Sequence, residues 1–395
     1  MAEREGFEPS IRFCRILTFQ ASAFDHSATA PHTWKSSALA PPPGWRKGEA
    51  AVAPEHAGGQ HGGMIAALLA ILAQAAAAQS SGRVAPDTRA PSEIIAAAPA
   101  SDWVAIRPDD LVVMDLASDA AGRRRRVVVQ LMPPPFSQGW VANIHLLAKA
   151  RWWDGTSINR VQDNYVAQWG DATEKKPLPP GLNKVAESEY GMPFHPGLFP
   201  NAWSGGLIVP VPARLSIARP SRGPTLADPY AKHFTFVGGM PFAMTLKGAG
   251  ASPTPDRVWP VHCYGSVGVG RNLSPDTGTG AELYAVIGHA PRHLDRNIAV
   301  VGRVVEGIEH LSSLPRGTEA LGFYKTAEER VPIRSVRLAS DLPESERPRL
   351  QHLSTESASF ARYADARANR RDAFFIRPAG GVDICNVPVP VRRAP

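Results

Sequence analysis

The stretch SINRVQDNYVAQWGD, residues 157–171, is the part of the chain around which the rest can be interpreted. It begins as an extended run over residues 157–162, directly after a turn at residues 152–155. By residue type alone, Arg160 would be a solvated strand residue, and Tyr165 would be a core aromatic as readily as a ligand contact. The meaning of the stretch therefore depends on the elements around it.

The segment before this stretch is predicted to form a hairpin followed by a helix. Residues rich in β-branched side chains predict strands at 111–116 and 126–131, joined by a turn at 120–123. Apolar residues with a 3.6-residue period predict an amphipathic helix over residues 140–150. The four arginines at 123–126 lie at the hairpin turn without interleaved aromatic residues, so we interpret them as a solvated turn rather than a nucleic-acid site.

The segment after the stretch is a long insertion, residues 173–258, dense in proline and glycine. Within it, residues 233–237 and 242–246 alternate like strands and could pair around Gly238 and Gly239. Beyond it, the glycine-rich stretch 265–280 is expected to make tight turns. Further strands are expected at 283–287, 298–304 and 333–338, with a short helix at 307–314. Many strands with one helix between them predict a closed antiparallel barrel with helical lids.

The tail, residues 341–395, differs in character from the preceding chain. A helix rich in Ala and Arg is expected within residues 354–371, followed by extended segments at 374–378 and 382–387. These pieces are too short to build a core of their own, so we expect them to pack against the main domain.

The N-terminal part contains one strongly apolar segment, residues 64–78, which is too short to span a bilayer comfortably. Its length and its small residues before Gln79 suit a signal peptide, although a basic segment in front of it is missing. A buried or amphipathic helix is the alternative. We predict translation from Met64, a non-native or disordered extension over 1–63, a linker over 79–100, and a periplasmic protein.

The length, net charge and cysteine count of the chain exclude few classes of function. The 395 residues carry a formal charge of +7, which permits weak attraction to nucleic acid or anionic membrane without requiring it. The three cysteines, Cys14, Cys263 and Cys385, lack the spacing of a zinc site. Once the N-terminus is removed, Cys263 and Cys385 would remain, either reduced or joined in one disulfide.

The stretch 157–171 resembles the signature FHRxxxxFxxQGGD of the cyclophilins. The resemblance places Arg160 on the catalytic arginine, Tyr165 on the pocket phenylalanine and Gln168 on the glutamine. Val166 occupies a position where the family usually has methionine. Gly170 and Asp171 fall on the final pair of the signature.

The second half of the chain also resembles this family. Residues 278–284 resemble the NGSQFF segment, which places Glu282 on its glutamine and Tyr284 on its second phenylalanine. His293 and Leu294 fall on the tryptophan and leucine of the WLDGKH loop, and residues 300–307 resemble VFGKVxxG. The resemblance implies a mainly β fold. It is an eight-stranded antiparallel cyclophilin-like barrel over residues 101–340, with capping helices, the insertion 173–258 and a C-terminal appendage.

The chain departs from the family pattern at several positions. Asn159 replaces the histidine before the arginine, and Ile298 replaces the loop histidine. Glutamine becomes Glu282, and tryptophan becomes His293. These changes leave Arg160 in place but alter one wall of the implied pocket.

The resemblance implies a peptidyl-prolyl cis-trans isomerase, a rotamase that assists the folding of secreted proteins. Rotation about an X–Pro bond passes through a twisted amide and has a barrier of about 18–20 kcal/mol in simple peptides. No bond is broken, so neither metal nor cofactor is expected, and preferential binding of the twisted state is sufficient. Arg160 would donate a hydrogen bond to the prolyl nitrogen. The implied pocket residues are Tyr165, Val166, Tyr284 and Leu294, with His293 at the rim, and Gln168 and Glu282 would hold Arg160 or the substrate backbone.

The expected partners are proline-containing polypeptides, with no nucleic acid and no stable membrane span. Two rival functions remain open at this stage. One is a module that binds proline segments with little catalysis, and the other is an envelope scaffold that uses the insertion and the basic tail.

Overall fold

The computed structural model describes residues 88–195, 230–231, 233–247 and 254–395. The predicted extension 1–63 and signal peptide 64–78 lie outside these residues, as do the first part of the expected linker and residues 196–229 of the insertion.

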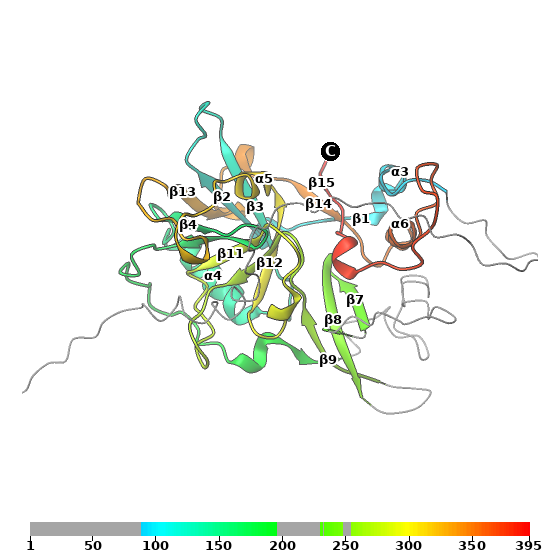
Figure 1. Cartoon of the computed structure of the whole chain (residues 1–395), viewed down its shortest axis with the longest axis horizontal. Helices are drawn as coiled ribbons and strands as arrows, with labels where there is room; N and C mark the ends of the chain where they lie inside the picture. Colours follow the sequence, from blue (N-terminus) through cyan, green and yellow to red (C-terminus); the bar gives the residue numbers. More distant parts are fainter. Residues whose placement is uncertain (1–87, 196–229, 232, 248–253) are drawn as a thin grey trace, which may run out of the picture. The chain divides into compact units, whose positions relative to one another are not determined.

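Eight strands close into an antiparallel barrel, as predicted (Figure 1). Their order around the barrel is β10-β11-β5-β4-β13-β2-β3-β12, and β12 pairs with β10 to close the sheet. Closing the sheet pairs the backbone N–H and C=O groups that would otherwise be exposed on its edge strands. The barrel strands are β2 Leu111–Leu116, β3 Arg125–Leu131, β4 Ser157–Val161, β5 Val166–Gly170, β10 Ser266–Val269, β11 Leu283–Val286, β12 Val300–Glu306 and β13 Val331–Leu338.

The amphipathic helix α4, Gln138–Lys149, packs its apolar face against the barrel core. Its apolar stripe includes Trp140, Ile144 and Leu147, each of which is at most 1% exposed. Full burial of such side chains contributes about 1.5–3 kcal/mol each. A second, shorter helix, α5 Glu309–Ser312, follows β12 and contributes Leu311 to the same core.

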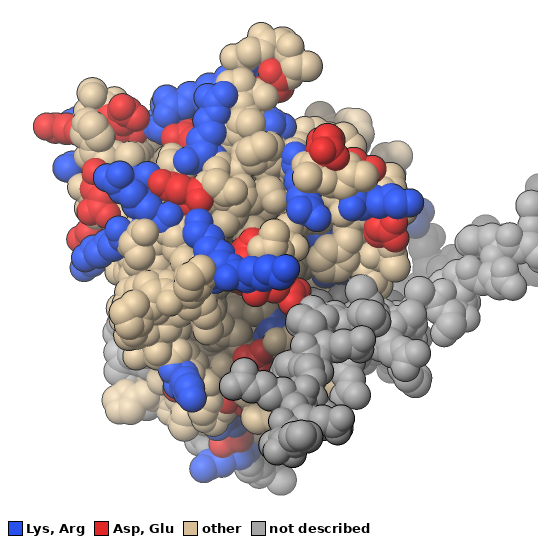
Figure 2. Space-filling view, turned by 90° about the vertical axis from the view of Figure 1, so that its left-hand side faces the viewer, with Lys and Arg blue, Asp and Glu red and all other residues tan. Residues whose placement is uncertain are grey.

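The arginine run at the β2–β3 hairpin is engaged by acidic residues of the same hairpin. Asp119 accepts from Arg123, and Asp115 accepts from both Arg124 and Arg126. These ion pairs fix the turn. Lys, Arg, Asp and Glu side chains are intermixed over the face drawn in Figure 2, rather than separated by sign.

The insertion contributes a four-stranded sheet, order β6-β9-β8-β7, made of β6 Met192–Pro193, β7 His233–Val237, β8 Met240–Lys247 and β9 Thr254–Pro260. The expected hairpin is present: β7 pairs with β8 in register Val237↔Met240. Gly238 and Gly239 make the turn with φ of 55° and 81°, a backbone region that favours glycine.

The ends of the described chain meet in a third sheet, β1 Trp103–Ala105, β14 Leu350–Leu353 and β15 Val391–Arg393. Two helices, α3 Pro91–Ala96 and α6 Ala358–Ala368, lie against each other (Figure 1). They share an apolar cluster that includes Ile94, Phe360 and Tyr363. The tail thus packs on other parts of the chain, and residues 91–96 of the segment expected as a linker form a short helix that buries Ile94.

Two expectations for backbone conformation were wrong. Residues 266–269 of the glycine-rich stretch form the barrel strand β10 rather than turns. Gly268 is required there by close approach, because a Cβ at this position would lie 2.3 Å from the Tyr284 ring. In the tail, neither extended segment is present: residues 384–386 are a 3₁₀ turn, and residues 374–378 run through a turn and a bend. The 3₁₀ segments are η2 Ala100–Asp102, η3 Pro108–Asp110, η4 Glu187–Tyr190, η6 Arg292–Leu294, η7 Ala320–Gly322, η8 Ala339–Asp341, η9 Glu344–Glu346 and η10 Ile384–Asn386.

Cys263 and Cys385 form a disulfide, which decides between the two states that the sequence left open. It ties the tail to the segment that precedes β10. Within the described ranges, no helix has both the length and the apolar character needed to cross a membrane.

Candidate active site

The candidate site lies on the outer face of three neighbouring strands, β4, β5 and β11. Ala167 and Trp169 of β5 point into the barrel core, so Val166 and Gln168, which alternate with them, point outward. In the pairing register, Gln168 lies opposite Arg160 on one side and opposite Tyr284 on the other. Strand pairing alone therefore brings these three side chains together.

A β-bulge in β4 sets the position of Arg160. Ile158 of β4 pairs with Trp169 of β5. The next residue of β5, Gln168, pairs with Arg160 and not with Asn159. A bulge adds one unpaired residue to a strand and re-aims the side chain that follows it. Asn159, which replaces the family's histidine, is this extra residue.

Arg160 is a buried cation held in one orientation. Its side chain is 3% exposed, and its Nη1 donates to Gln168 Oε1 at 3.1 Å. Its Nε donates to the carbonyl oxygen of Leu321 at 2.8 Å, and its Nη2 donates to Gln162. Such bonds to a charged group compensate its removal from water and fix its geometry.

Two aromatic rings flank the same guanidinium. Its carbon lies 5.8 Å from the ring centre of Tyr165 and 5.3 Å from that of Phe323. Contacts at this range stabilise a cation through the quadrupole of the ring. The guanidinium of Arg160 therefore has two aromatic rings as neighbours.

An apolar cluster adjoins the guanidinium, and it contains all four side chains expected to line the pocket. Tyr165, Val166, Tyr284 and Leu294 pack together with Val286 and Ile298. Burial raises the pKa of Tyr284 well above its ordinary value. It also raises the pKa of Tyr165, against the lowering effect of Arg160.

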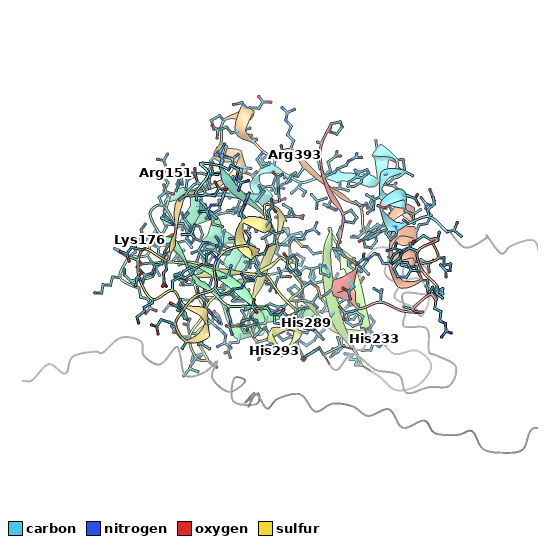
Figure 3. All side chains as sticks on the ribbon, turned by 45° about the horizontal axis from the view of Figure 1, so that its top comes forward. Arg151, Lys176, His233, His289, His293 and Arg393 are labelled. Atoms are coloured by element: carbon cyan, nitrogen blue, oxygen red, sulfur yellow. A yellow bond between two sulfur atoms is a disulfide. The ribbon has the colours of Figure 1, made fainter. Side chains whose placement is uncertain are left out.

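The rim of this cluster faces solvent. Tyr165 and Ile298 are only partly buried, whereas His293 is exposed. The His293 ring stacks on the Tyr165 ring at 6.4 Å between centres. Figure 3 labels His293 and His289 toward the lower edge of the described ribbon. Burial lowers the pKa of His293, partly offset by the carboxylate of Asp295.

Gln168 and Glu282 line a cavity of about 350 Å³ on the polar side of the site. Other charged residues of both signs line the same cavity, among them Asp171, Lys176 and Arg271. The pocket side chains Tyr165, Val166, Tyr284, His293 and Leu294 are not part of its lining. The structure thus divides the predicted site into a polar wall on an open cavity and an apolar cluster beside it.

Glu282 contacts Gln168, which stands between it and Arg160. Gln168 Nε2 donates to Glu282 Oε2 at 3.4 Å, while Gln168 Oε1 accepts from Arg160. Burial raises the pKa of Glu282 to about 7, although hydrogen bonds from Gln168 and Asn159 act in the opposite direction. Gly170 makes room for this carboxylate, since a Cβ there would lie 1.8 Å from Glu282 Oε1.

Sequence reasoning missed the residues of two loops. Leu321 and Phe323, which hold Arg160, come from the segment before β13, where no motif indicated a role. His262, which hydrogen-bonds Tyr284, lies in the segment before β10. Among the described residues, no group of three or more His, Cys, Asp or Glu side chains is arranged to hold a metal ion.

A closed eight-stranded barrel with a clamped arginine beside an apolar cluster on its outer face is the arrangement that the cyclophilin resemblance implied. The family model for cyclophilin type peptidyl-prolyl cis-trans isomerase/CLD matches residues 126–339, and the chain belongs to this family. The family's activity is the interconversion of cis and trans X–Pro bonds.

One solved cyclophilin structure shares the fold of this chain. The cyclophilin AquaCyp293 from Hirschia baltica superposes with a TM-score of 0.52 at 21% sequence identity, over 73% of this chain and 92% of that chain. A cyclophilin type isomerase from Cryptosporidium parvum, crystallised in the presence of the dipeptide ala-pro, gives a TM-score of 0.29 at 12% identity over 57% of this chain and 98% of that chain. No curated protein matches the chain.

Proposed function

We propose that this chain accelerates the rotation of X–Pro bonds in other polypeptides with Arg160 as its catalytic residue. The observation that carries the proposal is the position of the guanidinium: buried, held by Gln168, and next to the apolar cluster. A donor that is fixed before the substrate arrives needs no reorganisation when charge changes in the transition state.

In the proposed mechanism, Arg160 stabilises the twisted amide. As the bond rotates, resonance is lost and the prolyl nitrogen becomes a hydrogen-bond acceptor. The guanidinium remains charged at any physiological pH and donates to this nitrogen more strongly than to the planar ground state. A millionfold acceleration requires about 8 kcal/mol of such differential stabilisation.

The proline ring would contact the apolar cluster at its partly exposed edge, next to Tyr165 and Ile298. His293, stacked on Tyr165, would form the rim. Residues of the substrate that precede the proline would extend toward the cavity lined by Gln168 and Glu282. Its mixed charges would favour polar side chains there.

The test is a refolding assay limited by prolyl isomerisation, with wild type and Arg160→Ala at equal concentrations. Wild type should accelerate the slow phase, and the variant should lose about 10²-fold or more in kcat/KM, as expected for removal of a preorganised donor. Equal rates for the two proteins would contradict the catalytic role.

We further propose that the clients are secreted proteins and that the chain acts in the periplasm. The Cys263–Cys385 disulfide supports this proposal, because disulfides persist in oxidising compartments. Mass spectrometry of the protein from fractionated cells should find it in the periplasm, beginning at Gln79. Peptides from before Met64 would contradict the proposed start of translation.

A module that binds proline segments without useful catalysis is the second candidate. The separation of the open cavity from the apolar cluster favours it, since Tyr165, Tyr284 and Leu294 do not line the cavity beside Gln168 and Glu282. In that case wild type and Arg160→Ala would bind an X–Pro peptide and both would leave its rotation rate unchanged.

A further inference from the structure

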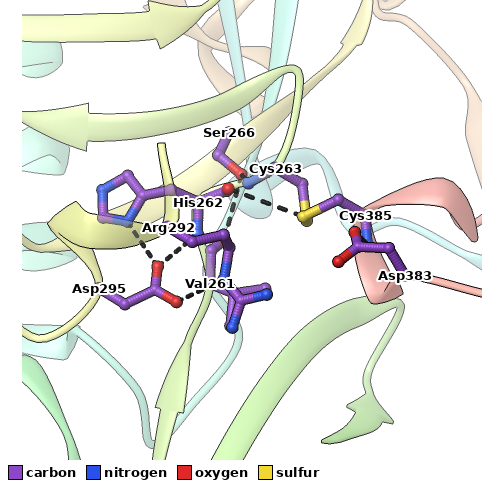
Figure 4. The surroundings of a disulfide bond; sticks show 8 residues. All are labelled: Val261, His262, Cys263, Ser266, Arg292, Asp295, Asp383 and Cys385. Atoms are coloured by element: carbon purple, nitrogen blue, oxygen red, sulfur yellow. Dashed lines mark hydrogen bonds and ion pairs between the residues drawn. A yellow bond between two sulfur atoms is a disulfide. The ribbon is translucent and has the colours of Figure 1, made fainter. Parts of the chain in front are cut away.

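A buried hydrogen-bonded chain lies behind the apolar cluster, and neither the family resemblance nor the mechanism above uses it. It runs from Arg292 through Asp295 and His262 to the hydroxyl of Tyr284. His262 is 0% exposed, and Asp295 and Arg292 are 4% and 5% exposed. Figure 4 shows His262 and Arg292 converging on the carboxylate of Asp295.

The contacts of Asp295 assign the proton of the imidazole. Asp295 Oδ1 accepts from the backbone N–H of His262 at 2.9 Å and lies 3.0 Å from Nδ1 of the same residue. Its Oδ2 accepts from Arg292 Nε at 2.6 Å. A carboxylate next to Nδ1 requires a proton there, which leaves Nε2 as an acceptor in the neutral ring.

Tyr284 uses that acceptor. Its hydroxyl lies 2.9 Å from His262 Nε2, so it donates to the ring. The two rings are nearly parallel, with centres 6.3 Å apart. A buried tyrosine hydroxyl needs such a partner, and the partner fixes the position of the ring to which the hydroxyl is attached.

Gly268 makes this geometry possible. In the barrel it lies directly opposite Tyr284, and an added Cβ would be 2.3 Å from both Cζ and Oη. Only a residue without a side chain lets the phenol lie flat across β10 toward His262. The hydrogen bond and the glycine therefore act together to determine where the ring lies.

The segment that carries His262 is itself anchored. The next residue, Cys263, is joined to Cys385, and its backbone N–H donates to Ser266 Oγ at 2.9 Å (Figure 4). His262 is consequently held through its backbone as well as through both ring nitrogens.

We propose that His262 is a positioning residue, which with Asp295 holds Tyr284 as a fixed wall of the proline pocket. The proposal rests on the function proposed above, since it gives Tyr284 a place in that pocket. A ring that is held in one rotamer before binding loses no further freedom when the substrate arrives. His262 contacts neither substrate nor Arg160 in this account, and acts only through Tyr284.

The test compares His262→Leu with His262→Gln, in which the amide offers both a donor and an acceptor. His262→Leu should lower kcat/KM in the refolding assay by about five- to tenfold, the effect expected from one hydrogen bond. His262→Gln should recover most of that loss. Tyr284→Phe, which removes only the hydroxyl, should reproduce the loss if His262→Leu does not fold.

Imidazole ¹⁵N NMR checks the hydrogen bond itself, while the recovery of kcat/KM by His262→Gln at unchanged stability separates positioning from a merely structural role. Wild type should show His262 protonated at Nδ1 only, and Tyr284→Phe should shift the Nε2 resonance. Wild-type activity that depends on Arg160 but is equal in folded His262→Leu or Tyr284→Phe would contradict the positioning role alone. A wild-type protein as inactive as Arg160→Ala would contradict the proposed function, and the positioning role with it.

Discussion

The two walls of the candidate site meet on strand β5, at Gln168 and Val166, but are built by opposite means. The polar wall holds a buried cation with neutral oxygens and borders an open cavity at Gln168 and Glu282. The apolar wall consists of side chains packed on one another, and its most deeply buried hydroxyl, that of Tyr284, is hydrogen-bonded from behind by His262. Both walls are thus fixed without a substrate.

This difference shows how one site can serve two needs. A rotating amide needs a donor whose position is fixed, whereas a proline ring needs only an apolar surface of suitable shape. The polar wall should therefore govern the rate of rotation, and the apolar wall should govern binding of the ring.

Gln168→Ala gives the largest effect expected within this comparison. It removes the side chain that holds Nη1 of Arg160 and contacts Glu282. A hydrogen bond to a charged group contributes about 1.5–3 kcal/mol, so kcat should fall about tenfold or more. Unchanged kcat in steady-state isomerase kinetics would mean that Arg160 is positioned without Gln168.

Phe323→Leu should have a smaller effect on the same quantity. The ring lies 5.3 Å from the guanidinium carbon, and leucine keeps the apolar volume without the quadrupole. A cation–π contact contributes about 0.5–2 kcal/mol, which corresponds to a loss of about two- to thirtyfold in kcat. A loss confined to KM would instead assign Phe323 to substrate binding.

Glu282→Gln should change the pH dependence of the free energy of unfolding more than it changes isomerase activity. Burial raises the pKa of Glu282 to about 7, so the folded state holds this proton more tightly than the unfolded state does. The stabilisation from the protonated group is complete below the unfolded value, 4.5, and is lost as pH rises to about 7.

Urea titrations between pH 4.5 and 8 would measure this effect. The difference in the free energy of unfolding between Glu282→Gln and wild type should become more positive across that interval and level off above pH 7. A difference that stays constant with pH would show that the pKa of Glu282 is the same in the folded and unfolded states.

The barrel and much of the site were predictable from sequence because they depend on local patterns. Alternation and β-branched content located β2, and the 3.6-residue period located α4. The motif around Arg160 and Gln168 lies on paired strands, so its residues stay together once the strands pair.

The remaining features depend on contacts between distant segments. No local pattern joins Leu321 to Arg160, or His262 to Tyr284. The strand at residues 266–269 was missed because its glycine suggests a turn, although Gly268 is there to accommodate the Tyr284 ring. Local propensity is overridden in such cases by packing that the sequence does not display.

Exchange NMR on a short X–Pro peptide at saturating enzyme tests the central claim most directly, because it measures the rotation rate of bound peptide apart from its binding. Wild type should raise the cis–trans exchange rate. Arg160→Ala should bind the peptide through the intact apolar wall and leave its exchange slow. Fast exchange on the Arg160→Ala variant would contradict the account.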